Sequence, residues 1–220
     1  MIIYRHFLND VKSLIIAREI LGDCYVQKAA GNYADKSALN AHLIGKAMTK
    51  FEFERLRLDY EKITVGVHGK PIHGNIAFNV SHSKDAVVAA FSERENVSSL
   101  SLGIDVIESH GRYSEIVVKK RFSIAENILV EQDKLNFAKI WAVKEAYLKA
   151  IGSGIAFGLN RIDTVSENGD FKISVDGNVQ NDCDIGFLDV SEGLTCCLVV
   201  KYVKDKNRKI IVDGIQINDF

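Results

Sequence analysis

The sequence lacks both the cysteine pattern of a zinc site and the apolar run of a membrane span. It has four cysteines, none of them in a CxxC pair: Cys24, Cys183, Cys196 and Cys197. This argues against zinc and against a redox dithiol, so we expect reduced thiols in the core. No run approaches the ~18 apolar residues of a membrane span, and Met1–His6 lacks a basic lead followed by a long apolar core. We therefore expect a cytoplasmic protein without a membrane partner.

The chain also has almost no excess of charge. It carries 28 Lys and Arg against 29 Asp and Glu, a formal net charge of −1. Such a balance gives no general attraction to nucleic acid or to a membrane, so any anion must be bound by a local cluster of cations. With 220 residues, 47% of them hydrophobic, the chain can bury a core as one large domain or as two of about 100 residues. We expect no nucleic-acid partner.

One predicted helix, from about 136 to 151 with Gly152 after its end, carries charges where apolar groups are expected. At ~100° per residue, Lys144 lies in the middle of its apolar stripe, and Glu145 and Lys149 lie at the edge. The stripe consists of Phe137, Ile140, Trp141, Leu148 and Ile151. Removing an unpaired ion from water costs several kcal/mol, so we expect these three side chains to face charged groups.

Turn residues divide the chain into two halves. The first has helical spacing from about 37 to 57, a glycine-containing loop at 66–74 and strand-like runs at 76–81 and 86–91. The polar stretch 92–99 would lead out of it. The sequence thus predicts a helix followed by two strands joined by a tight connection.

The second half repeats this order. A strand at 102–107 opens it, and the helix follows. Further strand-like runs lie at 161–165, 171–175, 185–190 and 195–203. The repetition favours a duplicated α+β unit. We predict an α+β fold of two similar halves, 1–101 and 102–220, related by pseudo-twofold symmetry with the site at their seam, and a monomer. For 204–220 we predict a solvated turn and a terminal strand.

Two acids from different elements are candidates for a metal site. Side chains alternate along the strand at 102–107, so Asp105 shares a face with Gly103. By itself, such an acid is an ordinary feature of an exposed sheet face. Paired with Glu145 from the helix, it becomes a candidate Mg²⁺ ligand, because a hard cation takes one or two carboxylates together with water and phosphate oxygens.

Ser81 and His82 at a strand end, and Lys70 in a Gly-Lys-Pro loop, are candidates for binding an anion. A serine hydroxyl, an imidazole and the N–H groups of a turn suit a phosphate. The alternative is a turn serine beside a surface histidine, and a lysine such as Lys70 is common in surface loops. A Ser-His hydrolase is disfavoured, since adjacent residues cannot easily form the bond from nucleophile to base and no nucleophile elbow is present.

Four motifs follow one another along the chain: GKP at 69–71, FNVSHS at 78–83, GIDVIE at 103–108 and WAVKEAYLKAIGSG at 141–154. In residues, order and spacing they resemble the 4′-phosphopantetheinyl transferases of the two-domain, Sfp type. The resemblance implies transfer of the phosphopantetheine arm of coenzyme A to a serine of an apo acyl or peptidyl carrier protein. The reaction would depend on Mg²⁺ and release adenosine 3′,5′-bisphosphate.

The resemblance also implies roles for single residues. Asp105 and Glu145 match the metal-ligand positions, and Glu145 would also direct removal of the serine proton. Four further positions match contacts to coenzyme A phosphates: Lys144 and Lys149 match phosphate-contacting lysines, and Ser81 and His82 match a pyrophosphate-binding pair. Lys70 corresponds to another phosphate-binding lysine. We therefore expect Glu145, Asp105 and Lys149 to be catalytic.

Two positions depart from the Sfp pattern. A second acid is usual two residues after the aspartate, but Ile107 stands there and Glu108 follows one place later. By strand alternation Glu108 should face away, so we expect a water in that coordination position. The spacing Asp-x-x-Glu is similar to that of the small holo-acyl-carrier-protein synthases, which are about half this length and trimeric. Upstream, an expected arginine has no counterpart, and Lys36 or His42 would meet the 3′-phosphate of the nucleotide.

Two other functions remain alternatives. A non-catalytic paralogue that binds coenzyme A or a carrier would keep the pocket without turnover, and the missing second acid is compatible with it. Against it, the charged groups of the motifs are present together, although they are costly to bury. A different Mg²⁺-dependent phosphoryl or nucleotidyl transferase is the other alternative, and no P-loop or kinase motif supports it.

Overall fold

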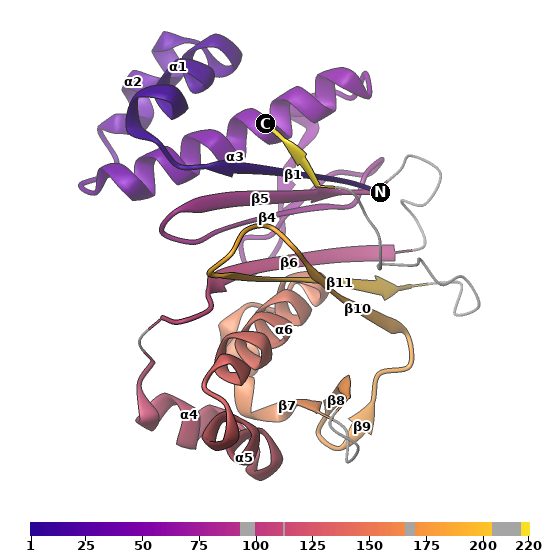
Figure 1. The fold of residues 1–220 in the computed structure, drawn as a ribbon. Helices are drawn as coiled ribbons and strands as arrows, with labels where there is room; N and C mark the ends of the chain where they lie inside the picture. Colours follow the sequence, from indigo (N-terminus) through magenta and orange to yellow (C-terminus); the bar gives the residue numbers. More distant parts are fainter. Residues whose placement is uncertain (93–99, 112, 166–169, 204–216) are drawn as a thin grey trace.

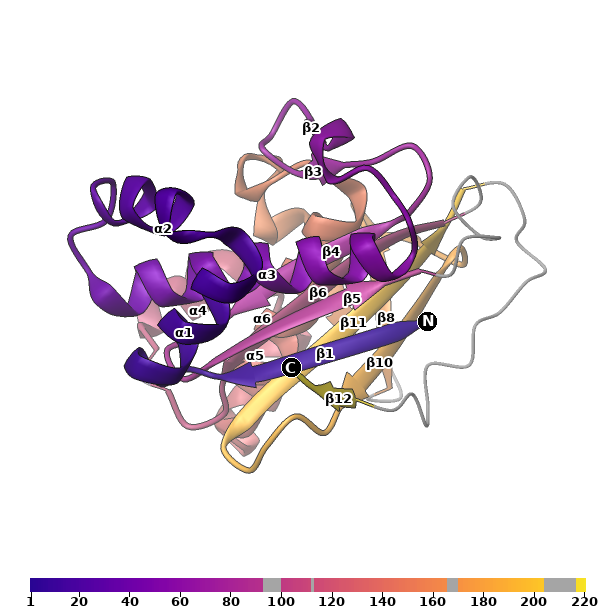
Figure 2. The same ribbon diagram turned by 90° about the horizontal axis from the view of Figure 1, so that it is seen from above.

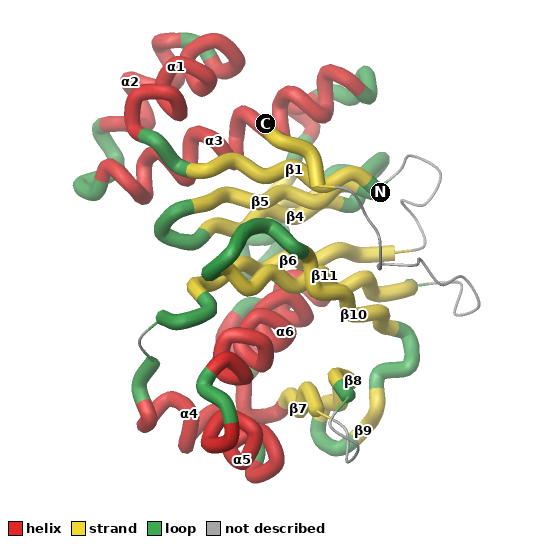
Figure 3. Tube along the Cα trace, in the orientation of Figure 1, coloured by secondary structure: helices red, strands yellow, loops and turns green. Residues whose placement is uncertain are grey.

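We obtained a computed structural model of the chain, which describes residues 1–92, 100–111, 113–165, 170–203 and 217–220. Two sheets lie between two groups of helices (Figure 1), and the helices occupy the two outer sides of the molecule (Figure 3). The α+β fold predicted from the sequence is thereby confirmed. Within the described residues, no helix combines the length and the apolar character needed to cross a bilayer.

The first sheet has the strand order β12-β1-β5-β4, and the helices α1–α3 cover its outer face (Figure 1). Strand β1 pairs antiparallel with β5, which pairs antiparallel with β4. The elements of this half are β1 (Ile2–Phe7), α1 (Asp10–Leu21), α2 (Asp23–Ala30), α3 (Lys36–Arg55), the 3₁₀ turn η1 (Tyr60–Lys62), β2 (Thr64–Val65), β3 (Pro71–Ile72), β4 (Phe78–His82) and β5 (Ala86–Phe91).

The second sheet has the order β10-β11-β6, with both pairs antiparallel, and α6 packs on its outer face. Its elements are β6 (Leu100–Glu108), α4 (Glu115–Arg121), α5 (Ile124–Gln132), α6 (Leu135–Ile151), the 3₁₀ turns η3 (Ile155–Phe157) and η4 (Leu159–Arg161), β7 (Ile162–Val165), β8 (Phe171–Val175), β9 (Asn178–Val179), β10 (Cys183–Leu188) and β11 (Leu194–Tyr202). Strands β7, β8 and β9 form a small separate sheet.

The connectivity of the first sheet recurs in the second. In each half, a strand and a later helix are followed by a hairpin, and the second strand of the hairpin pairs with the first strand of the half. Strands β1, β4 and β5 thus correspond to β6, β10 and β11. The repeated order read from the sequence is present, while the rotational relation between the halves stays a prediction.

Strand β5 shows why the two sheets stack. All of its residues, Ala86–Phe91, are buried, since it is covered on both faces. Val88 and Ala90 pack with Ile104 of β6 and other residues in the core between the sheets. Val87, Ala89 and Phe91 contribute to a core with α3 on the opposite face. A continuous apolar run therefore forms this strand, where an alternating pattern would have left one face in water.

The strands at the ends of the two halves lie close to the predicted division at 101 and 102, or cross it. Strand β6 already begins at Leu100, and the predicted terminal strand, β12 (Ile217–Asp219), returns to pair in parallel with β1 of the first half. The predicted stretch 92–99 lies almost wholly outside the described residues, as does the basic cluster after 203. The division of the chain into two domains stays a prediction.

The four cysteines are free thiols. Cys196 and Cys197 are buried in β11 and Cys183 is half-buried. Cys24 is exposed on α2, so the expectation of a core position was wrong for this residue.

Candidate functional site

A close approach of α6 to β6 brings the two predicted metal ligands to one place. A Cβ atom on Gly103 would lie 1.9 Å from the Ala146 carbonyl oxygen and 2.4 Å from the Ala150 amide nitrogen, so only glycine allows this packing. Asp105 lies two residues further along β6 on the same face as Gly103, and Glu145 precedes Ala146 on α6. Both carboxylates line one cleft at the seam of the two halves.

Asp105 is only 7% exposed and lies in a network of hydrogen bonds. Its Oδ1 accepts a hydrogen bond from Ser81 Oγ at 2.9 Å and another from Lys149 Nζ at 2.6 Å. Lys149 Nζ also donates to Ser81 Oγ at 2.7 Å and to the Ile104 carbonyl oxygen at 3.1 Å. The structure thus brings together Ser81, Asp105 and Lys149, from β4, β6 and α6.

Glu145 has an unpaired polar atom. Its Oε1 is buried and, among the described residues, has no hydrogen-bond partner. Burial raises the pKa of Glu145, and the nearby Asp105 carboxylate raises it further, while Lys149 lowers it. A cation is favoured at such a place, because one carboxylate oxygen lacks a hydrogen-bond donor and a second carboxylate lies nearby.

The two acids fit a magnesium ion. Mg²⁺ prefers oxygen ligands and is commonly held by one or two carboxylates, with waters and substrate oxygens completing its octahedron. No third His, Cys, Asp or Glu of the described residues joins Asp105 and Glu145 in a metal-binding group. The remaining coordination positions would fall to water and to a bound ligand.

Glu108 reaches the same cleft but is engaged elsewhere. Strand β6 runs without a bulge from Asp105 to Glu108, opposite Cys197 and Leu194 of β11. At the end of the strand, Glu108 Oε1 accepts a hydrogen bond from the Lys84 backbone N–H at 2.9 Å, while its side chain lines the cleft with both acids. Glu108 therefore anchors the turn between β4 and β5. That a water takes the third position stays a prediction.

Lys144, which the sequence placed among the phosphate contacts, lies in the interior of the second half. It is 0% exposed, and its ammonium group forms an ion pair with Glu126 of α5 at 2.7 Å. It also donates to the carbonyl oxygens of Ile162, Leu159 and Arg121 at 2.5, 3.1 and 3.1 Å. The charge that this residue faces is an internal carboxylate, and the structure does not bring Lys144 to the cleft.

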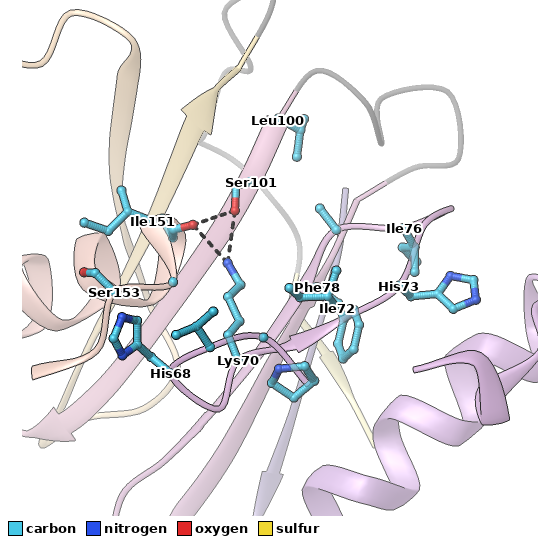
Figure 4. Close-up of a pocket in the computed structure, with 16 residues that line it drawn as sticks. His68, Lys70, Ile72, His73, Ile76, Phe78, Leu100, Ser101, Ile151 and Ser153 are labelled. Carbon is cyan, nitrogen blue, oxygen red and sulfur yellow. Dashed lines mark hydrogen bonds between the residues drawn. The ribbon is translucent and has the colours of Figure 1, made fainter. Parts of the chain in front are cut away.

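Lys70 joins the β2–β3 loop to the second half (Figure 4). Its Nζ donates to Ser101 Oγ at 3.0 Å, to the Leu102 carbonyl oxygen at 2.9 Å and to the Ala150 carbonyl oxygen at 3.0 Å. Burial lowers its pKa to about 8. An ammonium group has three N–H donors, and here each has an acceptor. In this arrangement Lys70 fixes the loop and leaves no donor for a phosphate.

The β2–β3 loop itself lies beside the segment that follows α6 (Figure 2). Gly154, with φ of +64°, is close to His68 of this loop, since a Cβ there would be 3.4 Å from the His68 Cβ. Lys70, Glu145 and Lys149 line a second cavity under the loop. Glu145 therefore lines both this cavity and the cleft that it shares with Asp105.

A third cavity lies between α3 and β4. His82 of β4 is exposed and lines both this cavity and the cleft of the two acids. His42 lines it from α3, with its ring 5.1 Å from that of Tyr33, and burial lowers the pKa of His42. Lys36 is exposed at the start of α3. The structure places His42 in this cavity and leaves Lys36 on the surface.

Lys46 is a site residue that the sequence reasoning missed. It is half-buried and lines the third cavity together with His42 and His82. The positive charge of Lys46 also lowers the pKa of His42, because it disfavours a second positive charge on the imidazole. The spacing of four residues from His42 places both on one face of α3 and was the signal available in the sequence.

The three cavities are neighbours, because they share lining residues. His82 lines both the third cavity and the cleft of the two acids, and Glu145 lines both the cleft and the cavity under the β2–β3 loop. The cavities together present Lys46, Lys149 and the two acids. This set of charges can hold a polyanion together with a divalent cation.

Comparisons with known proteins find similar proteins in one family. The family model of the 4′-phosphopantetheinyl transferase superfamily matches residues 101–192. The 4′-phosphopantetheinyl transferase gsp of Aneurinibacillus migulanus is 28% identical over 71% of this chain and 64% of its own length. The 4′-phosphopantetheinyl transferase psf-1 of Bacillus pumilus is 32% identical over 46% of this chain and 45% of its own. The chain thus spans less than two thirds of the length of these curated relatives, 64% of one and 45% of the other.

A solved structure matches as well. The holo-[acyl-carrier-protein] synthase of Thermotoga maritima has 25% sequence identity and a TM-score of 0.38, covering 46% of this chain and 61% of its own.

Proposed function

Since this chain belongs to the 4′-phosphopantetheinyl transferase superfamily, we propose that it transfers the 4′-phosphopantetheine arm of coenzyme A to a serine of an apo carrier protein, acyl or peptidyl. The reaction would depend on Mg²⁺ and release adenosine 3′,5′-bisphosphate. The observation that carries the proposal is the pairing of Asp105 with Glu145, whose Oε1 is buried without a hydrogen-bond partner in the described structure.

The two acids would hold the metal ion between them. When bound there, Mg²⁺ supplies positive charge to the diphosphate and to the oxyanion that departs from it. Asp105 and Glu145 contribute one carboxylate each, and oxygens of the diphosphate and of water complete the shell. The packing of α6 against Gly103 sets the positions of both side chains, so the two carboxylates would already be in place before any substrate binds.

The chain's own groups would then orient the reactants. Lys149 lies next to both acids and carries a charge that can neutralise the diphosphate, and His82 borders the cleft from the other side. The serine hydroxyl of the carrier attacks the phosphorus that bears the pantetheine arm. A new P–O bond forms, the bond to the bridging oxygen breaks, and the hydroxyl proton goes to Glu145.

The nucleotide end of coenzyme A would lie in the cavity between α3 and β4. Lys46 and His42 lie on one face of α3 and line this cavity, so we propose them, in place of Lys36, as contacts of the 3′-phosphate. Tyr33, whose ring lies 5.1 Å from that of His42, offers an aromatic surface to the nucleobase of coenzyme A. His82 links this cavity to the cleft and would lie near the diphosphate.

The setting of the reaction is also a proposal. Coenzyme A and carrier proteins of biosynthetic pathways are the partners that this activity requires, and we propose that the protein acts on them in the cytoplasm as a monomer. The choice between acyl and peptidyl carriers is an outcome of the experiment below.

The test is a mass measurement on the carrier. The protein is incubated with coenzyme A and Mg²⁺ together with a panel of apo acyl and peptidyl carrier domains, with EDTA in a parallel series. We expect a carrier to gain the mass of phosphopantetheine only when Mg²⁺ is present, and to gain none with Glu145→Gln.

Binding of coenzyme A without a gain in mass on any carrier would instead identify a non-catalytic paralogue. Transfer by Glu145→Gln at the wild-type rate would remove this residue from the mechanism.

A further inference from the structure

The ammonium group of Lys149 is held in a complete set of oxygen acceptors. Asp105 Oδ1 lies at 2.6 Å, Ser81 Oγ at 2.7 Å and the Ile104 carbonyl oxygen at 3.1 Å from Nζ. A lysine has three N–H donors, and these acceptors match them in number. In this arrangement Lys149 behaves as a bound cation whose ligands are a carboxylate, a hydroxyl and a carbonyl. These are also the ligand types that a hard metal ion prefers.

The ion pair is sheltered from solvent. The side chain of Lys149 is 27% exposed and that of Asp105 is 10% exposed. Charge-assisted hydrogen bonds of this length in a partly buried place are stronger than those of surface ion pairs, which are screened by water and salt. Lys149 must therefore break a substantial interaction before it can donate to any other anion.

Asp105 is affected by the same contact. Its Oδ1 already accepts from both Ser81 and Lys149. A divalent cation on that oxygen would lie next to the ammonium group, and the two positive charges would repel in a site of reduced dielectric. Glu145 differs, since its Oε1 accepts no hydrogen bond from the described residues. Of the two metal ligands, one is free and one is shared with a cation of the protein.

We propose that Lys149 competes with the divalent cation for Asp105, and that a diphosphate removes this competition by drawing the ammonium group to itself. This proposal rests on the proposed function for the identities of the metal ion and of the diphosphate. Its consequence is a coupling of the two ligands. Coenzyme A releases Asp105 for the metal, and the metal displaces Lys149 toward coenzyme A, so that each ligand raises the affinity of the other by the same factor.

The competition is tested by metal binding, without turnover. Mn²⁺ replaces Mg²⁺ as a probe, and the signal of free Mn²⁺ in electron paramagnetic resonance gives its dissociation constant in the absence of coenzyme A. Lys149→Met keeps most of the length of the side chain and removes its charge. We expect Lys149→Met to bind Mn²⁺ at least tenfold more tightly than the wild type, while Asp105→Asn abolishes the binding in both backgrounds.

A matched variant controls for net charge. Lys139 is an exposed lysine on the same helix, and Lys139→Met makes the same change in charge away from the cleft. It should leave the Mn²⁺ affinity at the wild-type value. An equal rise in Lys139→Met would mean that the effect is one of overall charge, and the proposal would be overturned.

A second variant guards against a failure of Lys149→Met to fold. Ser81→Ala removes one of the three acceptors of Lys149 and also the hydrogen bond that Ser81 donates to Asp105, and it leaves every charge in place. It should raise the Mn²⁺ affinity by a smaller factor, about two- to fivefold, because loss of a single hydrogen bond weakens the hold on the ammonium group. In the double variant with Lys149→Met most of this gain should disappear, since both changes act through the contact between Lys149 and Asp105.

The outcomes separate this proposal from the proposed function. Unchanged or weaker Mn²⁺ binding in Lys149→Met would overturn the competition, even where the wild type still modifies a carrier. Absence of Mn²⁺ binding in every variant would overturn both the competition and the metal site. Tighter binding in Lys149→Met with no carrier modified would keep the competition and refute the transfer.

Discussion

Lys144 and Glu145 are neighbours in α6, yet their side chains have opposite surroundings. Lys144 is enclosed by Glu126 and three carbonyl oxygens, whereas the buried Oε1 of Glu145 has no partner among the described residues. The charge of Lys144 is fully paired, so Lys144 stabilises the fold. The carboxylate of Glu145 lacks such partners, which is common for a functional group.

Glu145 should make the metal-free protein less stable as the pH rises. Burial raises its pKa. An acid whose pKa is higher in the folded state contributes stability while it is protonated, and loses that contribution as the pH rises through the folded pKa. Glu145→Gln stays neutral, so it should raise the free energy of unfolding near pH 7, and this gain should disappear at a pH low enough to protonate glutamate in both the folded and the unfolded chain.

Thermal unfolding in EDTA at a series of pH values measures this difference. For a chain of this size, 1 kcal/mol corresponds to roughly 2–4 °C. Glu131→Gln, on the exposed side of α5, is the matched control and should show no such gain. A loss of stability in Glu145→Gln at neutral pH would mean that the carboxylate is stabilised by its neighbours.

Lys144 should stabilise the folded protein and should make no contribution to the binding of coenzyme A. Lys144→Met leaves Glu126 as a buried charge without its partner, which costs about 3–5 kcal/mol. Urea unfolding should show this loss, and Glu126→Gln in the same chain should restore much of it. Coenzyme A affinity of the folded fraction should stay at the wild-type value. A selective loss of coenzyme A affinity would show that Lys144 contacts a phosphate of coenzyme A after all.

At the scale of elements, the packing of α6 on β6 decides the geometry of the site. Gly103→Ala would place a methyl group 1.9 Å from the Ala146 carbonyl oxygen, which is a severe clash, so the helix must move away from the strand. Overpacking of this kind costs about 1–3 kcal/mol or more. It should also separate Asp105 from Glu145 and weaken Mn²⁺ binding. Gly74→Ala, where a Cβ meets no atom within 4 Å, is the control. Wild-type Mn²⁺ affinity in Gly103→Ala would contradict this account.

Much of this element structure could be predicted from local patterns. The spacing of apolar residues predicted the long helices α3 and α6, and short apolar runs between turns predicted β4, β5, β6 and β11. The partner of Lys144 could not be predicted, because Glu126 lies on α5 and no local pattern sets the position of α5 against α6. The Ser123-x-x-Glu126 sequence marks a helix start, and the capping box is present, but it gives no sign that Glu126 is buried.

The sequence motifs named residues that the structure brings together, although their roles stay predictions. Ser81, Asp105 and Lys149 are joined by hydrogen bonds, and His82, Asp105 and Glu145 line one cleft. Lys70 was expected at a phosphate, but its charge is used by carbonyl oxygens of the second half. That use depends on the packing of the halves, which a sequence motif does not encode.

At the scale of the whole molecule, the C-terminal end joins the second half back to the first. Strand β12 pairs in parallel with β1, and Arg5 forms an ion pair with Asp219 at 2.7 Å. The Phe220 ring packs against Tyr4 and Phe51 at centroid distances of 6.1 and 5.5 Å. These contacts cover an edge strand that would otherwise be open to pairing with another chain.

Removal of residues 217–220 should therefore loosen the first half and spare the second. It deletes three strand pairings and one partly buried aromatic ring, and we expect a loss of about 1–3 kcal/mol in the free energy of unfolding. Hydrogen exchange should accelerate in β1 and remain slow in β11. Because His82 and Lys46 belong to the loosened half while Asp105 and Glu145 do not, coenzyme A should bind more weakly whereas Mn²⁺ affinity persists. Equal acceleration of exchange in β11 would show that both halves unfold as one unit, which contradicts an independent first half.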